Sequence, residues 1–426
     1  MIFTKAQDVI SYLYSLPKFH AKGDLTFIRR VLAELDNPQD KVKMLHVTGT
    51  NGKGSTSYYL SNLLQKAGQR TGLFVSPYIF AFGERIQLNG QNLSDDDLVA
   101  TSNLIEEVLQ KIRQTDPEFG LVTFEYEAVM AFTYFAQKKC NYAVIEVGIG
   151  GTHDSTNVIK PEVSIITTVG LDHEQVIGPT IQDIAREKSG IIKNQRPVVV
   201  GNVPPTVLPI IKNKAKEEQA PLFELGQDFT VSNSVQINYQ DLERKLTFAI
   251  RPEVEGYDIA VAVRAFSTLN LALSNSKIEE AINQTIIPGR YQILQEQPLI
   301  ILDGAHNMQA MQNLLDFVHQ QQARRQGKVR VLITMMKDKD LTQVFSLFKE
   351  SDQVELTTIA YPRAAKKADF PPTVQAKYPY HSDWQSCFTQ LKQDSQPNDI
   401  LLVTGSFYLV GEVLQLEATN ARSRNW

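Results

Sequence analysis

The sequence of 426 residues has little cysteine: Cys140 and Cys387 stand alone, far apart and without metal-ligand or redox spacing. We therefore interpret both as buried or idle thiols rather than as parts of a disulfide framework or a metal centre. No apolar run approaches the ~18 residues that a membrane-spanning helix requires. The first residues also lack a basic segment followed by an uninterrupted apolar stretch, so we expect a cytoplasmic protein.

An excess of charge of one sign is also absent, because 43 Lys and Arg residues stand against 47 Asp and Glu residues, a formal net charge of −4. The charges are spread along the chain rather than gathered in blocks. This distribution gives no electrostatic reason to expect nucleic acid or an anionic membrane as a partner. The chain is too long for one ordinary core, and its length predicts two or three domains.

The most informative segment present is HVTGTNGKGS, from His46 to Ser55. Residues 42–47 alternate between apolar and polar and predict a strand, whereas residues 57–67 carry apolar side chains at helical spacing. A glycine-rich turn at a helix N-terminus presents unpaired N–H groups and the positive end of the helix dipole, which together bind anions. Lys53 adds a mobile charge for the β and γ phosphates of ATP.

This loop departs from the standard phosphate-loop formula. Gly54 stands between Lys53 and Ser55, and Val47 occupies the place of the first glycine. A glycine-rich turn that binds nothing is the alternative. With the lysine and the hydroxyl both in place, an ATP phosphate site is the prediction, and its contacts would come from Thr50, Asn51, Gly52, Lys53, Gly54 and Ser55.

The variant spacing TGTNGKGS resembles the ATP loop of the Mur ligase superfamily, and most closely that of its folylpolyglutamate synthase and dihydrofolate synthase branch. The resemblance extends along most of the chain, and its blocks follow the family's order. The further blocks are Asn37-Pro38-Gln39, Ser76-Pro77, Glu84-Arg85-Ile86, EVGIGG (146–151), Asp154 with Asn157, Leu171-Asp172-His173, IAREKSGIIK (184–193), LDGAHN (302–307) and TGS (404–406).

Short apolar strands alternate with helical stretches after an N-terminal helical segment. This alternation predicts a mainly parallel sheet covered by helices, with ligands at the carboxyl ends of the strands. Residues 223–250, including the segment 228–237, instead show short alternating segments, which predict a small antiparallel β excursion. The strands expected in the parallel sheet are 43–47, 71–75, 143–147, 163–169 and 197–201.

The turn Pro288-Gly289-Arg290 precedes a new series of strands, so we place a domain boundary there. The fold class is therefore α/β. We predict an N-terminal P-loop-type ATPase domain over residues 1–289 and a smaller, Rossmann-like glutamate-ligase domain over residues 290–426. The strands expected in the second domain are 299–303, 329–334, 354–359 and 400–404.

ATP needs a divalent ion, and Mg²⁺ keeps several waters, so one or two protein oxygen ligands are enough. Glu146 is a candidate ligand, because a carboxylate at the end of an apolar strand is costly to bury unpaired. An edge-exposed or salt-bridged glutamate is the alternative. The resemblance implies that Glu146, Ser76 and His173 bind magnesium. By residue type alone, His173 is more simply a hydrogen-bonded loop histidine, since magnesium rarely prefers imidazole.

Lys188 lies in IAREKSGIIK, which we interpret as a helix entering an apolar strand. A buried ammonium close to magnesium would be repelled by the metal. The resemblance implies that this lysine is carbamylated and, as an anion, helps to organise the metal site, where a monovalent cation is a further candidate. The alternative is an ordinary lysine at a helix end, with Lys193 as an equal candidate.

Three residues of the second domain complete the predicted site. The resemblance implies that Arg290 and Asp303 contact ATP and that His306 lies near the phosphates and the incoming amino acid. The planar donors of arginine suit paired contacts with phosphate oxygens. The alternatives are a solvated linker charge for Arg290, and a helix N-cap with a passive neighbour for Asp303 and His306. The TGS segment is a weaker candidate for lining the amino-acid pocket.

The reaction that the resemblance implies joins L-glutamate to a folate carboxylate through an acyl phosphate, with Lys53, Lys188 and His306 as the catalytic residues. The partners would be ATP, a reduced folate and L-glutamate, and no motif demands more than a monomer. Asp154-Ser155 replaces the Asp-Ala associated with bifunctional members, which favours tetrahydrofolylpolyglutamate synthesis over a bifunctional enzyme or a dihydrofolate synthase.

Two other interpretations remain open. A cell-wall Mur ligase shares the ATP loop, but the Ser76-Pro77 and Glu84-Arg85 blocks argue against it. An inactive, nucleotide-binding paralogue is the alternative of another class. The family has a glutamine and an asparagine near the adenine where this chain reads GYDIAVAV from Gly256, and Met308 replaces the proline that usually follows the asparagine at 307.

Overall fold

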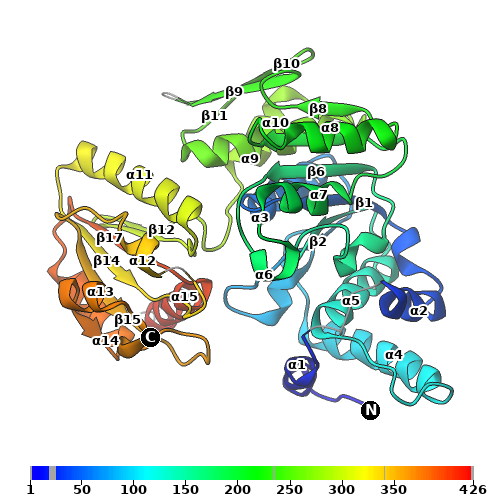
Figure 1. The fold of residues 1–426 in the computed structure, drawn as a ribbon, viewed down its shortest axis with the longest axis horizontal. Coiled ribbons are helices and arrows are strands. Elements are labelled where there is room, and N and C mark those ends of the chain that lie inside the picture. The colour runs from blue at the N-terminus through cyan, green and yellow to red at the C-terminus, as the bar shows by residue number, and fades with distance from the viewer. Residues whose placement is uncertain (1, 19–24, 234–235, 340, 424–426) are drawn as a thin grey trace. The chain divides into compact units, whose positions relative to one another are not determined.

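The computed structural model describes residues 2–18, 25–233, 236–339 and 341–423 (Figure 1). The chain forms two compact units. The first comprises Met1–Ser76 with Phe82–Thr285, and the second comprises Pro77–Ala81 with Ile286–Trp426. The expected boundary between residues 289 and 290 lies close to this division. None of the helices within the described ranges is both long enough and apolar enough to cross a membrane.

The first unit is built on an eight-stranded sheet in the order β4-β3-β2-β5-β1-β6-β7-β8. Strands from β2 to β8 along this order run parallel, and β3 and β4 add antiparallel strands at one edge. The predicted, mainly parallel sheet is confirmed. The strands are β1 (Lys43–Thr48), β2 (Thr71–Phe74), β3 (Ile86–Leu88), β4 (Gln91–Asn92), β5 (Tyr142–Glu146), β6 (Val163–Thr168), β7 (Val198–Asn202) and β8 (Leu222–Glu224).

The central strands are apolar along their length because helices cover the sheet on both faces, as parallel sheets require. In β5, for example, Ala143, Val144 and Ile145 are all fully buried. The helices of this unit are α1 (Ala6–Ser15), α2 (Thr26–Glu34), α3 (Lys53–Lys66), α4 (Asp95–Arg113), α5 (Thr123–Gln137), α6 (Glu174–Ile177), α7 (Ile181–Ser189), α8 (Leu208–Glu217), α9 (Glu253–Ser267) and α10 (Asn275–Asn283).

The segment around Lys188 corrects one prediction. Helix α7 ends at Ser189, and the expected apolar strand after it is wrong, because Ile191 and Ile192 form a buried turn and the next strand begins at Val198. The carbonyl of Ile191 accepts a hydrogen bond from Ser164 Oγ at 2.7 Å. The apolar pair therefore fills the core without joining the sheet.

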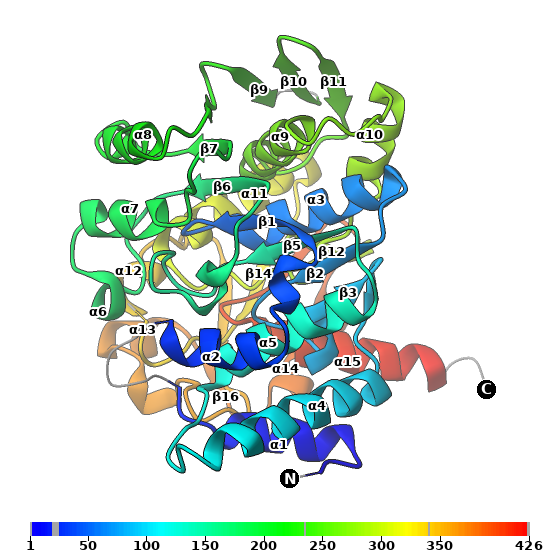
Figure 2. The same ribbon diagram turned by 90° about the vertical axis from the view of Figure 1, so that its right-hand side faces the viewer.

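The predicted antiparallel excursion is confirmed as a three-stranded sheet in the order β11-β10-β9. Its strands are β9 (Phe229–Asn233), β10 (Ile237–Asp241) and β11 (Lys245–Phe248), and they lie over α9 and α10 (Figure 2). Alternate residues such as Tyr239 and Leu246 are buried, whereas their neighbours face outward, which explains the alternating pattern. Residues 234–235 of the predicted segment lie outside the described residues.

The second unit has a six-stranded sheet in the order β12-β13-β17-β14-β15-β16, parallel except for β12. Two apolar clusters, one containing Leu402 and the other Leu401, are buried within this unit. The predicted smaller α/β unit is confirmed. Its elements are β12 (Gln292–Glu296), β13 (Leu299–Leu302), α11 (Met308–Arg325), β14 (Val329–Ile333), α12 (Leu341–Phe345), β15 (Gln353–Thr357), α13 (Pro372–Lys377), β16 (Tyr380–His381), α14 (Trp384–Asp394), β17 (Ile400–Thr404) and α15 (Phe407–Ser423).

Candidate active site

The predicted phosphate loop connects the end of β1 to the start of α3, as the sequence indicated. Gly52 has a φ of +83°, a left-handed conformation that favours glycine. A Cβ at Gly52 would lie 2.1 Å from Oδ1 of Asp258, and a Cβ at Gly49 would lie 1.9 Å from Oγ1 of Thr167. Both glycines are therefore required by the side chains that pack against the loop.

Lys53 is the first residue of α3, and its side chain folds back over the loop. Its Nζ donates to the carbonyl oxygen of Gly49 at 2.9 Å and to that of Thr50 at 3.3 Å. The ammonium group thus lies at the helix N-terminus, where the helix dipole and the lysine charge both favour an anion. A phosphate oxygen could replace these two carbonyl oxygens as the hydrogen-bond acceptor of Lys53.

The loop is also bonded to the end of β6, a feature that the sequence analysis missed. Thr50 Oγ1 donates to the carbonyl of Gly170 and accepts from its N–H, both at 2.9 Å. The carbonyl of Asn51 accepts from Thr167 Oγ1 at 2.6 Å and from Thr168 Oγ1 at 3.0 Å. The Thr50 hydroxyl is therefore directed to the loop after β6, although we expected Thr50 among the ATP contacts. The sequence signal for this contact was the pair of adjacent threonines, Thr167 and Thr168, at the end of β6.

Glu146 and Ser76 are brought together at the start of α3. The N–H of Ser76 donates to Oε2 of Glu146 at 2.8 Å. A Cβ at Gly54 would lie 3.7 Å from both carboxylate oxygens of Glu146, which is only 3% exposed. A buried carboxylate beside a serine, at the edge of a phosphate loop, offers the oxygen ligands that Mg²⁺ prefers. These residues fit a magnesium ion bound together with nucleotide phosphates.

His173 follows β6 in the loop that Thr50 holds. It has a φ of +52° and precedes the short helix α6. Its Nε2 lies 3.8 Å from Oδ2 of Asp172, and its side chain is 43% exposed. Within the described residues no group of three His, Cys, Asp or Glu side chains is arranged to hold a metal ion. The predicted metal site therefore depends on the mixed set of Glu146, Ser76 and His173.

Lys188 is 4% exposed on α7 and lies within electrostatic range of Lys53 and Asp172. Burial, and to a smaller extent Lys53, lower the pKa of Lys188 to about 7, against the opposite effect of Asp172. Lys193, the other candidate, donates from Nζ to Oδ1 of Asn157 at 2.7 Å, and burial lowers its pKa to about 8. Lys188 is therefore the more deeply buried lysine and the one beside the phosphate loop.

In the second unit, Asp303 directly follows β13 and organises the turn there. Its Oδ1 accepts from the N–H of Ala305 at 2.7 Å, and its Oδ2 accepts from the N–H of Tyr291 at 2.8 Å. Burial raises the pKa of Asp303, and the nearby Arg290 acts against that rise. His306 Nδ1 donates to the carbonyl of Gly304 at 2.8 Å. Because a carbonyl can only accept, the neutral ring carries its proton on Nδ1 and its Nε2 is an acceptor.

Phe407, which the sequence analysis did not single out, joins these residues. The guanidinium carbon of Arg290 lies 4.4 Å from the centroid of the Phe407 ring. The rings of His306 and Phe407 meet edge to face, with centroids 6.1 Å apart. The helix N-cap that we considered for Asp303 and His306 is instead Asn307, whose side chain accepts from the N–H of Ala310 at 2.9 Å. Arg290, Asp303 and His306 thus form one cluster within this unit.

The TGS segment, Thr404 to Ser406, shapes the turn between β17 and α15. Thr404 is fully buried, and Ser406 Oγ accepts from the N–H of Tyr408 at 3.1 Å. Gly405 has a φ of +91° and packs against the carbonyl of Thr334. These contacts direct the segment toward the interior of the second unit.

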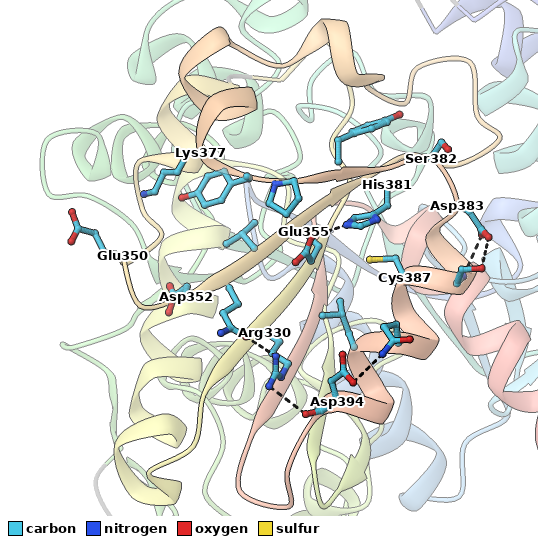
Figure 3. A pocket seen from close by; sticks show the side chains of 18 residues that line it. Arg330, Glu350, Asp352, Glu355, Lys377, His381, Ser382, Asp383, Cys387 and Asp394 are labelled. Carbon is cyan, nitrogen blue, oxygen red and sulfur yellow. Dashed lines mark hydrogen bonds and ion pairs between the residues drawn. The ribbon is translucent and has the colours of Figure 1, made fainter.

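A cavity of about 1060 Å³ in the second unit lies beside β15, β16 and α14 (Figure 3). Two charged side chains on its walls are already bonded within the unit: His381 bonds to Glu355 at 2.8 Å, and Arg330 to Gln353 at 2.6 Å. None of the site residues predicted from the sequence lines it. We therefore do not count this cavity as part of the candidate active site.

Comparison with protein families matches both units. Residues 47–272 match the Mur ligase middle domain, and residues 289–407 match the Mur ligase glutamate ligase domain. These two matches define the class of protein as a ligase of the Mur type.

Curated relatives narrow the class. The chain is 31% identical to a dihydrofolate synthase/folylpolyglutamate synthase of Bacillus subtilis, over 97% of this chain and 99% of the relative. It is also 31% identical to a folylpolyglutamate synthase of Lacticaseibacillus casei, over 96% and 97%. The chain therefore belongs to the Mur ligase family, in its folylpolyglutamate synthase and dihydrofolate synthase branch.

Solved structures agree along the whole chain. FolC of Escherichia coli in complex with DHPP and ADP superposes with a TM-score of 0.88 at 27% identity, covering 98% of this chain and 99% of that one. The bifunctional enzyme of Yersinia pestis, complexed with AMPPNP and a Mn ion, gives 0.86 at 30% identity, with coverage of 97% and 98%. A complex of FPGS with AMPPCP and folate gives 0.84 at 28% identity, with coverage of 97% and 99%.

Proposed function

We propose that this chain is a tetrahydrofolylpolyglutamate synthase, which uses ATP to add L-glutamate to the γ-carboxyl of reduced folates. The observation that carries the proposal is the position of a buried acid next to the phosphate loop. The carboxylate of Glu146 lies beside Gly54 and accepts a hydrogen bond from the N–H of Ser76 at 2.8 Å. Support comes from a relative named folylpolyglutamate synthase and from similar structures in complex with nucleotide analogues and folate.

The reaction proceeds in two steps. An oxygen of the folate carboxylate attacks the γ-phosphorus, the bond to the β-phosphate oxygen breaks, and ADP leaves. The amine of glutamate then attacks the acyl carbon, loses a proton, and expels phosphate to leave an amide. The protein's contribution is positioning and charge stabilisation, because phosphoryl transfer requires little else from it.

Each residue has a definite part in this scheme. Lys53 and the N-terminus of α3 stabilise the charge on the β and γ phosphates. Arg290 grips phosphate oxygens with its planar donors. His306, with Nε2 as an acceptor, takes the proton from the attacking amine.

Glu146, Ser76 and His173 would hold the magnesium ion. When bound, Mg²⁺ neutralises phosphate charge and polarises the γ-phosphoryl group. A manganese ion in the similar Yersinia pestis structure supports a divalent metal in this branch.

We include carbamylated Lys188 in the proposal. A carbamate forms when the neutral amine attacks CO₂ and releases a proton, so a pKa near 7 favours it. The product is an anion, which suits a position beside Lys53 and the predicted metal better than an ammonium group does. Lys193 would be the weaker candidate, since its ammonium already bonds to Asn157.

Dihydrofolate synthase activity is the second candidate, because the Bacillus subtilis relative is named for both activities. One assay distinguishes them. Purified protein is incubated with ATP, Mg²⁺ and L-glutamate plus either a tetrahydrofolate or dihydropteroate, and ADP and the glutamylated product are measured.

We expect glutamate-dependent product with the tetrahydrofolate and little with dihydropteroate. Product with both acceptors would make the enzyme bifunctional, and product with dihydropteroate alone would replace the proposal. Nucleotide binding without any glutamate-dependent ADP release would support the inactive paralogue. A cytoplasmic monomer remains our prediction, to be tested by fractionation and by sedimentation of the purified chain.

A further inference from the structure

Phe407 is the first residue of α15, immediately after the turn that ends β17. It is 7% exposed, and its ring packs on the backbone of two other segments. A Cβ at Gly304 would lie 2.4 Å from the ring, and a Cβ at Gly289 would lie 3.3 Å from it. These two glycines are themselves joined, since Gly304 N–H donates to the carbonyl of Gly289 at 2.9 Å. The ring thus covers the junction of two loops that carry site residues.

Arg290 directly follows Gly289 and lies over the face of the Phe407 ring, with its guanidinium carbon 4.4 Å from the ring centroid. The negative face of an aromatic ring attracts a guanidinium group, and more strongly where water is partly excluded. This contact restricts the position of the guanidinium group above the ring, while its N–H donors stay available for phosphate oxygens.

His306 lies two residues after Gly304. Its ring meets the ring of Phe407 edge to face, with the two centroids 6.1 Å apart and an interplanar angle of 68°. The hydrogen bond from Nδ1 to Gly304 and the contact with Phe407 constrain the imidazole from two directions. One aromatic ring therefore constrains both the phosphate-binding arginine and the proposed proton acceptor.

We infer that Phe407 is a positioning residue for the ligase reaction: its ring sets the orientation of Arg290 and His306 together. This inference rests on the proposed function, which gives those two residues their contacts with ATP and the amino acid. The competing interpretation is that Phe407 only fills the core at the start of α15. Core filling depends on volume, whereas positioning of Arg290 also depends on the electrons of the ring.

The test therefore changes the ring electrons while nearly keeping its shape. Phenylalanine with one, two or three fluorine atoms is incorporated at position 407, since each fluorine weakens the negative face of the ring. Phe407→Leu removes the ring, and the control is a buried phenylalanine of the same unit, Phe388→Leu, whose cluster carries no predicted site residue. The readouts are kcat and KM for ATP, the Kd for AMPPNP with Mg²⁺, and the melting temperature.

We expect kcat/KM for ATP and the affinity for AMPPNP to fall stepwise with fluorine number at an unchanged melting temperature. Phe407→Leu should lose roughly tenfold in kcat/KM, equivalent to about 1.4 kcal/mol, with a part of the loss in kcat because His306 is also released. Phe388→Leu should lose stability and keep both kinetic constants.

Two results would overturn the inference: fluorinated variants that match the wild type, or a Phe407→Leu variant whose only change is its melting temperature. The binding readout separates this inference from the proposed function. If wild-type protein binds AMPPNP but forms no glutamylated folate, the proposed function fails, while the dependence of binding on fluorine number still decides the role of Phe407.

Discussion

The buried amine of Lys188 leads to the most specific prediction. Burial, with a contribution from Lys53, lowers its pKa from 10.5 to about 7. A change of this size corresponds to ~5 kcal/mol against the charged form. The unfolded chain holds this lysine charged throughout that interval, so its contribution to stability increases as the pH rises from about 7 toward 10.5. Below about pH 7 the lysine is charged in both the folded and the unfolded chain, so the folded chain bears the full cost of burying an ammonium group.

The same pKa makes Lys188 reactive toward CO₂. Near neutral pH about half of the folded chains would carry a neutral amine here, compared with ~1 in 10³ for an ordinary exposed lysine. Because only the neutral amine forms a carbamate, we predict that the lysine is carbamylated at pH 8 and progressively unmodified toward pH 6. Labelling with ¹³C-bicarbonate and carbon NMR measures the carbamate directly, and ligase activity should fall in parallel.

Substitution tests the role of the group. Lys188→Ala should lower kcat by ~10²-fold, the upper range for a group that supports a metal site, and acetate or propionate should restore part of it by supplying an anion. Lys193→Ala is the matched control and should not respond to these acids, because Lys193 bonds to Asn157 and Gly190 instead. An active wild-type enzyme without a carbamate signal at pH 8 would refute the reasoning, as would a fully active Lys188→Ala variant.

Substitutions at three further positions test the phosphate loop and the acid beside it. Gly52→Ala should destabilise the fold by ~1–2 kcal/mol or more in urea unfolding, since its φ of +83° is left-handed and Asp258 occupies the space of a Cβ; an unchanged midpoint would contradict this. Glu146→Gln should raise the Mg²⁺ concentration needed for half-maximal activity by ~10-fold or more, and an unchanged requirement would exclude it as a ligand. Thr50→Val should lower kcat/KM by ~10-fold in an ADP-release assay while Thr50→Ser stays near wild type, because only serine keeps the hydroxyl bonds to Gly170; equal activities would remove this role.

Local patterns predicted the elements around the phosphate loop well. The alternation before Val47 and the helical spacing after Ser57 correctly indicate β1 and α3, because both elements bury a face and must carry a matching period. Short edge strands were missed. Strand β4, Gln91–Asn92, and strand β16, Tyr380–His381, are too short to show a period and depend on the neighbours with which they pair.

Ambiguity at helix ends explains the error after α7. Ile191 and Ile192 have the β-branched character of a strand, but the packing of Gly190 against Thr152 turns the chain before pairing can begin. Such a contact joins residues far apart in the sequence, and no local pattern records it.

For the candidate site, the sequence indicated residues that carry charge but not those that orient them. Glu146 ends β5, Asp303 directly follows β13, and Lys53 begins α3 after the glycine-rich turn. The local pattern predicts these three positions. Phe407 resembles an ordinary core residue of an apolar helix, although its ring contacts Arg290 from more than a hundred residues away. Orientation of this kind arises from tertiary packing, which periodicity does not encode.

The most direct test of the central claim is a single measurement: the release of ADP and the formation of glutamylated product when the purified protein meets ATP, Mg²⁺, L-glutamate and a tetrahydrofolate. The account predicts one ADP for each glutamate added, and loss of both products in Lys53→Met. ADP release that is independent of glutamate and folate, or binding of nucleotide with no product at all, would contradict it.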